Sequence, residues 1–264
     1  MNALRAVFVY EWKRSLTLGR VGWWYAMAAF PVMITILIRT LGDFELHSDI
    51  EEQKSIWSVT LYVLIPCVCV ALSVLLTAAP AVASELEQRS WIYLATRPNG
   101  ILWLLLGKFL VSVTWATTAA WVGTGFSVAL CGMDEPRRMW LSLSALSLLA
   151  AAAYSAVFML VGAVFPKRAM VFCMIYTMIV ELVFASIPAV INRMTVQFRL
   201  RTLFVNWMPI DERLKNESVF QYVMAEGSSF MQCFWLVGLS SLFLVAAILV
   251  AQRKEFTSAT EGDV

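Results

Sequence analysis

The chain has 264 residues, of which 60% are hydrophobic and 14% are charged, and its mean hydropathy is +0.74. A soluble domain is about 45–50% apolar and about 25% charged, and a soluble globule of this size has too little interior for so much apolar surface. The same figures exclude a disordered chain, and a formal net charge of +2 gives no reason to expect nucleic-acid binding. The composition therefore predicts an integral membrane protein.

Residues 1–20 predict an interfacial helix. Leu4, Phe8 and Trp12 recur at i, i+4 and i+8, so they share one stripe of a helix whose other positions include several charges. A helix of this kind lies flat at a membrane surface, with its aromatic side chains at the level of the headgroups. The alternative is that this segment simply extends the first membrane span.

Six long windows with no charged residue, or with a single one, predict six membrane-spanning helices. A span needs about 20 apolar residues because the hydrocarbon core of a bilayer is about 30 Å thick. A β-barrel would instead show alternating segments of about 10 residues. We therefore predict an all-α, polytopic membrane protein in which residues 1–264 form a single transmembrane domain. The predicted spans are residues 21–41, 57–82, 101–131, 139–165, 169–191 and 230–251.

The distribution of basic residues predicts the orientation. Six spans place both termini on one side, and with the N-terminus inside, 11 of the 20 Lys and Arg residues lie in inside segments and 9 lie outside. Residues 192–229 then form a long outer segment whose apolar stretches predict short interfacial or re-entrant helices. We expect a protein of the cytoplasmic (inner) membrane with both termini in the cytoplasm.

Residues 84–98, between the second and third spans, predict a short cytoplasmic helix. Ser84 can cap its N-terminus, the acidic residues that follow favour the positive end of the helix dipole, and Pro98 ends the helix. Trp91 and Leu94 would form an apolar stripe on one side. Such a helix is suited to docking a partner protein; the alternative is an interfacial helix that rests on lipid.

This segment resembles the intracellular signature of type-2 ATP-binding-cassette (ABC-2) exporter permeases. In that family the pattern E-x-E-x-G-T-L-x-x-L-x-x-x-P precedes a hydrophobic stretch that ends in Gly-Lys. Arg89, Ser90 and Trp91 replace the glycine, threonine and leucine of the pattern. Glu11 and Arg14 before a proline-containing first span, together with a basic C-terminal tail, are also similar to this family. The matching positions in the signature are Glu85, Glu87, Leu94, Pro98, Gly107 and Lys108.

The resemblance implies one permease half of an exporter that moves a substrate out of the cytoplasm. It would pair with a second permease chain, identical or related, and with cytosolic ATP-binding-cassette ATPase subunits that hold ATP and Mg²⁺. The N-terminal interfacial helix, with Glu11 and Arg14, would contact these ATPases together with the coupling segment. The coupling residues would be Glu85, Glu87, Ser90, Trp91, Leu94 and Pro98.

The chain itself is predicted to bind no cofactor and to be no enzyme. It has no G-x-x-x-x-G-K-[ST] phosphate loop, because Gly107 and Lys108 are followed by Phe109. The single histidine, His47, excludes multi-histidine metal sites. The five cysteines are interpreted as small apolar packing residues. No catalytic or metal-ligating residues are therefore expected.

Glu181 is the one ionisable residue deep inside a predicted span. A carboxylate at the centre of a bilayer costs about 2–3 kcal/mol on insertion scales, so it should face the helix bundle, a subunit interface or a water-filled path. Its functional interpretation is a substrate-path or proton-sensitive group. The structural alternative is a hydrogen bond to a hydroxyl such as that of Thr177, or to a neighbouring span.

A second class of function is a multi-span membrane scaffold or a secondary transporter with no ATPase partner. Secondary transporters of this size often show an inverted repeat with broken helices in matching positions. Residues 1–132 and 133–264 show no such symmetry. The sequence does not indicate the substrate.

Overall fold

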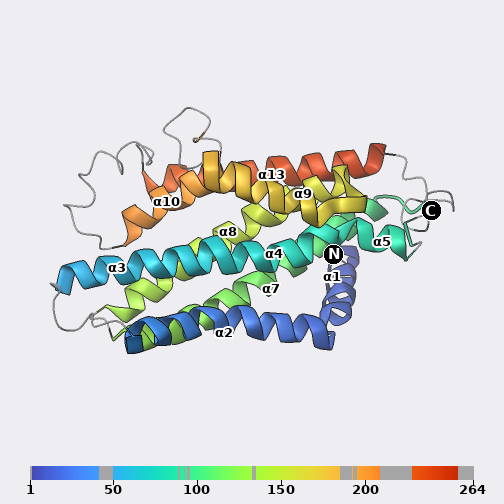
Figure 1. Ribbon diagram of the computed structural model, residues 1–264. Helices are drawn as coiled ribbons and strands as arrows, with labels where there is room; N and C mark the ends of the chain where they lie inside the picture. Colours follow the sequence, from blue (N-terminus) through green and yellow to red (C-terminus); the bar gives the residue numbers. More distant parts are fainter. Residues whose placement is uncertain are drawn as a thin grey trace.

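The computed structural model describes residues 2–41, 50–88, 90, 91, 93, 96–132, 135–184, 192, 195–208 and 228–254. All regular secondary structure in these residues is helical (Figure 1), which confirms the all-α prediction. The first elements are α1 (Asn2–Ser15), α2 (Leu18–Leu41), α3 (Ile50–Tyr62), η1 (Val63–Cys69), α4 (Val70–Ala78), η2 (Ala79–Ala81) and α5 (Ala83–Glu87). They are followed by α7 (Gly100–Cys131), α8 (Pro136–Val164), η3 (Pro166–Arg168), α9 (Ala169–Tyr176), η4 (Thr177–Val183), α10 (Val196–Trp207) and α13 (Ser229–Arg253).

Five helical stretches in the described part of the chain are long and apolar enough to cross a membrane, as expected of an integral membrane protein. They coincide with five of the six predicted spans. Of the sixth, predicted at 169–191, the structure describes α9, η4 and Phe184, and residues 185–191 lie outside the described residues. The five stretches are Leu18–Leu41, Gln53–Ala81, Gly100–Cys131, Pro136–Val164 and Ser229–Arg253.

α8 is the central helix of the bundle. It contacts α4, α7, α9, α10 and α13, and two thirds of its most apolar window is buried. Small residues such as Ala150, Ala151 and Ala153 line it, so neighbouring backbones can approach closely, which is how helices associate when lipid removes the hydrophobic driving force. Gly162 shows this best, because a Cβ at that position would collide with the carbonyl oxygen of Ala79.

The second span is interrupted by a π-helical stretch, η1, that contains Pro66. Proline has no N–H and its ring clashes with the preceding turn, so a helix that contains it must widen or bend. In α2, Pro31 is tolerated inside the helix, where it is buried against α7 beside Gly123.

α1 crosses the end of the bundle instead of continuing the axis of α2 (Figure 1). It ends at Ser15, and α2 begins only at Leu18, so the predicted interfacial segment 1–20 includes the first turn of α2. The face of α1 that is most buried carries Glu11 and Ser15, one position away from the predicted Leu4–Phe8–Trp12 stripe. Figure 1 also shows α5 and the C-terminal end of α13 at this end of the bundle.

Candidate functional site

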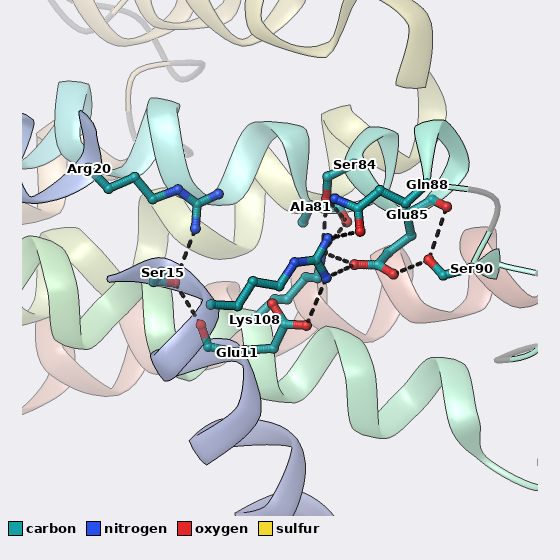
Figure 2. Close-up of polar contacts among 10 residues, drawn as sticks. Glu11, Ser15, Arg20, Ala81, Ser84, Glu85, Gln88, Ser90 and Lys108 are labelled. Atoms are coloured by element: carbon teal, nitrogen blue, oxygen red, sulfur yellow. Dashed lines mark hydrogen bonds and ion pairs between the residues drawn. The ribbon is translucent and has the colours of Figure 1, made fainter. Parts of the chain in front are cut away.

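Six polar residues from three separate segments meet where α1 crosses the bundle (Figure 2). We call them the Glu85 cluster: Glu11 and Arg14 from α1, Glu85 from α5, Gln88 and Ser90 just after α5, and Lys108 from α7. The chain separates these segments by up to 97 residues. The fold brings Glu11, Arg14, Glu85 and Lys108, four positions that the sequence analysis singled out, into one site.

Glu85 lies at the centre of the cluster and is only 2% exposed. Its Oε1 is 2.7 Å from Lys108 Nζ and 2.8 Å from Arg14 Nη1. Ser90 donates from its hydroxyl to Glu85 Oε2, and the same hydroxyl lies 3.1 Å from the Glu85 carbonyl oxygen. One buried carboxylate thus joins α1, α5 and α7.

Lys108 is the best satisfied charge of the cluster. Its ammonium group donates to the Ala81 carbonyl oxygen at 2.9 Å and to Ser84 Oγ at 2.9 Å, in addition to the ion pair with Glu85. An ammonium group has three N–H donors, so all three have partners. The prediction that Ser84 caps the short helix is wrong: Val82 stands at the N-cap without a side-chain bond, and the Ser84 hydroxyl serves Lys108 instead.

Arg14 connects α1 to the segment after α5. Besides Glu85 it contacts Glu11 Oε1 at 3.5 Å, and it donates from Nη2 to Gln88. Glu11 is buried at 6% exposure, and Ser15 donates to the Glu11 carbonyl oxygen at 2.8 Å. With two carboxylates and two cations, the cluster is formally neutral, as the burial of charge requires.

The electrostatics of the cluster keep Glu85 ionised. Burial alone raises the pKa of a carboxyl group, but the Lys108 ammonium and the hydrogen bonds from Lys108, Ser90 and Arg14 outweigh burial here. The pKa of Glu85 therefore lies below its ordinary value. The carboxylate is a permanent anion at neutral pH, and it acts as an electrostatic clamp between helices.

Gly107 makes this arrangement possible. A Cβ at Gly107 would lie 2.6 Å from Val7 Cγ1 and 3.6 Å from the backbone nitrogen of Phe8, so only glycine lets α1 lie this close to α7. Trp12 of α1 then packs edge-on against Trp115, with ring centroids 5.3 Å apart. The Gly-Lys pair of the motif has two roles here, since the glycine admits α1 and the lysine binds Glu85.

The remaining residues that were predicted to act in coupling are not members of the cluster. Glu87 is exposed on α5, and Pro98 is exposed in the turn before α7. Trp91 is 8% exposed and belongs to the apolar core, so it anchors the segment to the bundle. Leu94, like Arg89, lies outside the described residues. Among the predicted coupling residues, Glu87 is thus a surface carboxylate, whereas Glu85 is an internal one.

Glu181 is 4% exposed and caps a helix. Its Oε1 accepts from Tyr176 Oη at 2.8 Å and from the backbone N–H of Val196 at 3.2 Å, and its Oε2 accepts from the N–H of Gln197 at 2.9 Å. Val196 and Gln197 begin α10, where a helix has unsatisfied N–H groups and a positive dipole end. Thr177, the hydroxyl that the sequence analysis gave as an example, donates to the Cys173 carbonyl oxygen instead, and the hydroxyl that binds Glu181 is that of Tyr176.

Further buried hydrogen bonds connect α10 to its neighbours. Gln197 donates to Tyr154 Oη at 2.8 Å and accepts from Tyr62 Oη at 3.1 Å. Sequence reasoning missed this network, since a glutamine in a predicted outer segment and two tyrosines in different apolar runs show no common spacing. The contacts of Glu181 support its structural interpretation, because they occupy both carboxylate oxygens.

Sequence reasoning also missed the ion pair between Glu85 and Lys108. A signal was available, since Lys108 is the only charge within the run 101–131 that the sequence predicts to span the membrane. Such a lysine needs a buried anion or carbonyl groups. In the part of the chain that the structure describes, no group of three or more His, Cys, Asp and Glu side chains could hold a metal ion.

Comparison with known proteins does not assign the chain to a family. No family model matches the sequence, and no curated protein matches it.

Proposed function

We propose that this chain is the permease subunit of an ABC-2 type exporter, powered by separate ATP-binding-cassette ATPase subunits. The observation that supports this best is the Glu85 cluster, in which three motif segments far apart in the sequence meet at one end of the bundle. A chain that only filled the membrane would not need a buried charge network between α1, α5 and α7. The substrate would cross within a dimer of such permeases, with both termini in the cytoplasm.

In this proposal the ATPase binds the exposed surface beside the cluster, and the cluster couples movement of that surface to the helix bundle. The exposed Glu87 would contact a basic group on the ATPase, and the segment from Glu85 to Pro98 would move with it. Glu85 would carry this movement to α1 and α7, because its carboxylate binds Arg14 and Lys108 directly. The ionised pairs favour movement of these segments as one unit.

Co-purification with an ATPase tests the proposal directly. The tagged chain, expressed with its genomic neighbours and purified in mild detergent, should form a dimer that retains an ATPase subunit without membrane spans. Recovery of a monomer with no ATPase would instead favour a scaffold or a secondary transporter.

Glu87→Ala should weaken ATPase binding or transport-linked ATP hydrolysis while leaving the fold intact. Glu87 is exposed, so its loss should change the free energy of unfolding by no more than about 0.5 kcal/mol. At an interface, truncation of one partner of a charge pair costs about 2–5 kcal/mol of binding. Both quantities can be measured on one preparation, by thermal unfolding and by ATPase titration. Unchanged ATP-driven transport would rule out this docking role.

The orientation can be tested by labelling single cysteines on a cysteine-free background. Arg97→Cys, in the exposed turn before α7, should react with a membrane-impermeant maleimide only after the cells are opened. Cysteines at His47 and Asn216, in the predicted outer segments, should react in intact cells. Labelling at position 97 from outside would reverse the proposed orientation.

A further inference from the structure

A second polar feature lies outside the Glu85 cluster, between α2 and α4. α2 packs along α7 and makes few contacts with α4, and a small pocket opens between them. Its wall includes Arg20, Trp23 and Trp24 from α2, Ser73 and Thr77 from α4, and Trp115 from α7. The pocket thus lies between two candidate spans, and its Arg20 binds Ser15 of α1, so it lies near the end of the bundle where α1 lies.

Arg20, an exposed side chain, brings a positive charge to this pocket. Its Nη1 donates to Ser15 Oγ at 3.0 Å (Figure 2), and no carboxylate in the described part of the chain lies within ion-pair distance of it. A guanidinium group has five N–H donors, so most of its donors remain for a ligand. The carboxylates of Glu11 and Glu85 are engaged by Arg14 and Lys108.

Ser73 supplies a second, independent polar group. It is 6% exposed and lines the pocket, and its hydroxyl makes no hydrogen bond among the described residues. One turn further, the Thr77 hydroxyl is satisfied by the Ser73 carbonyl oxygen at 2.9 Å and by Ser112 Oγ at 2.7 Å. The Ser73 hydroxyl is therefore available to donate to a ligand oxygen in the pocket.

Indole rings form the apolar part of the wall. The side chain of Trp23 is 44% exposed, and Trp115 is buried. The indole N–H of Trp24 donates to Thr118 Oγ1 at 3.1 Å. Indoles near the end of a span favour the boundary between headgroups and acyl chains. A ligand that fits this wall therefore has an anionic oxygen beside an apolar body.

We propose that this pocket binds the phosphate of an anionic phospholipid from the leaflet on the α1 side. Arg20 binds the phosphate, Ser73 donates to a headgroup oxygen, and the exposed face of Trp23 lies along the glycerol and upper acyl chain. The pocket volume of about 20 Å³ admits little more than one oxygen-sized group, so one headgroup oxygen enters it and the rest of the lipid lies outside. This geometry favours a lipid over a free anion, since a lipid adds apolar contact outside the pocket. The site is independent of the proposed exporter function and needs no ATPase.

Native mass spectrometry of the purified chain in a neutral detergent tests the proposal. Phosphatidylglycerol should bind in preference to phosphatidylcholine, and Arg20→Gln should lower phosphatidylglycerol affinity about tenfold, the value of one lost charge-assisted bond. Ser73→Ala should lower it by a smaller factor. Arg5→Gln is the matched control, because Arg5 is an exposed cation of α1 and its removal changes the net charge equally.

Three results would overturn the proposal. The first is equal phosphatidylglycerol affinity of Arg20→Gln and the unmodified chain, and the second is an equal loss in Arg5→Gln, which would indicate only general charge attraction. The third is displacement of the lipid by inorganic phosphate at millimolar concentration, which would assign the pocket to a soluble anion. Thermal unfolding of Arg20→Gln should match that of Arg5→Gln, so that a loss of binding is not a loss of fold.

Discussion

Glu85→Gln is expected to lower the free energy of unfolding by about 3–5 kcal/mol, because removal of one partner of a buried ion pair leaves the other charges uncompensated. The substitution keeps the shape of the side chain but takes the anion from Lys108 and Arg14. The largest part of this loss comes from Lys108, because it is 8% exposed and Glu85 is its only ion-pair partner in the described part of the chain. Thermal unfolding in detergent measures the loss.

Glu87→Gln is the matched control, since it makes the same chemical change in the same short helix at an exposed position. It should change stability by no more than about 0.5 kcal/mol. A double variant, Glu85→Gln with Lys108→Met, should regain part of the stability, because removing both charges leaves neither one buried alone. Equal stability of Glu85→Gln and Glu87→Gln would contradict the assigned role of the cluster.

The ion pairs of Glu85 also predict that the free energy of unfolding depends on pH. The pKa of Glu85 in the folded chain lies below its value in the unfolded chain, so ionised Glu85 stabilises the fold above the unfolded value of about 4.3. This stabilisation is lost as the pH falls through the lower, folded pKa. The difference in stability between the unmodified chain and Glu85→Gln should therefore be full at pH 7 and shrink below about pH 4.3. A difference that stays constant on acidification would show that the charge of Glu85 is not the stabilising feature.

Glu181→Ala should destabilise the chain by several kcal/mol, because it leaves three donors without an acceptor. These are the Tyr176 hydroxyl and the backbone N–H groups of Val196 and Gln197. Each buried unsatisfied donor costs about 1–3 kcal/mol. The loss should be local to α10, so hydrogen exchange of the amides at the start of this helix should rise more than that of α8.

Glu181→Gln separates the structural role from a substrate-path role. Its amide oxygen keeps one acceptor for α10, so stability should lie between those of the unmodified chain and Glu181→Ala. Glu135→Ala, which removes an exposed carboxylate, is the control and should change stability little. If Glu181→Ala kept full stability and lost only transport, the capping role would be wrong and a substrate path would be favoured.

The amino-acid sequence by itself located the five helical stretches that are long and apolar enough to cross a membrane. Residues 101–131 and 139–165 were predicted within three residues of α7 and α8, because a bilayer of fixed thickness requires an apolar run of fixed length. Pro66 lies in the interrupted stretch η1 because a missing N–H acts on the turn that contains it. The resemblance of Glu85 and Lys108 to a known signature also came from spacing along the chain.

Only the tertiary structure decided which polar groups meet. Glu85 was expected at a docking surface, but it is buried because the packing of α1 and α7 brings Arg14 and Lys108 to it. Glu181 caps α10, a helix that begins 15 residues later, and no periodicity relates the two. The physical reason is that the apolar character of a span depends on its own residues alone. A buried charge instead needs partners, and these come from whichever helices pack beside it.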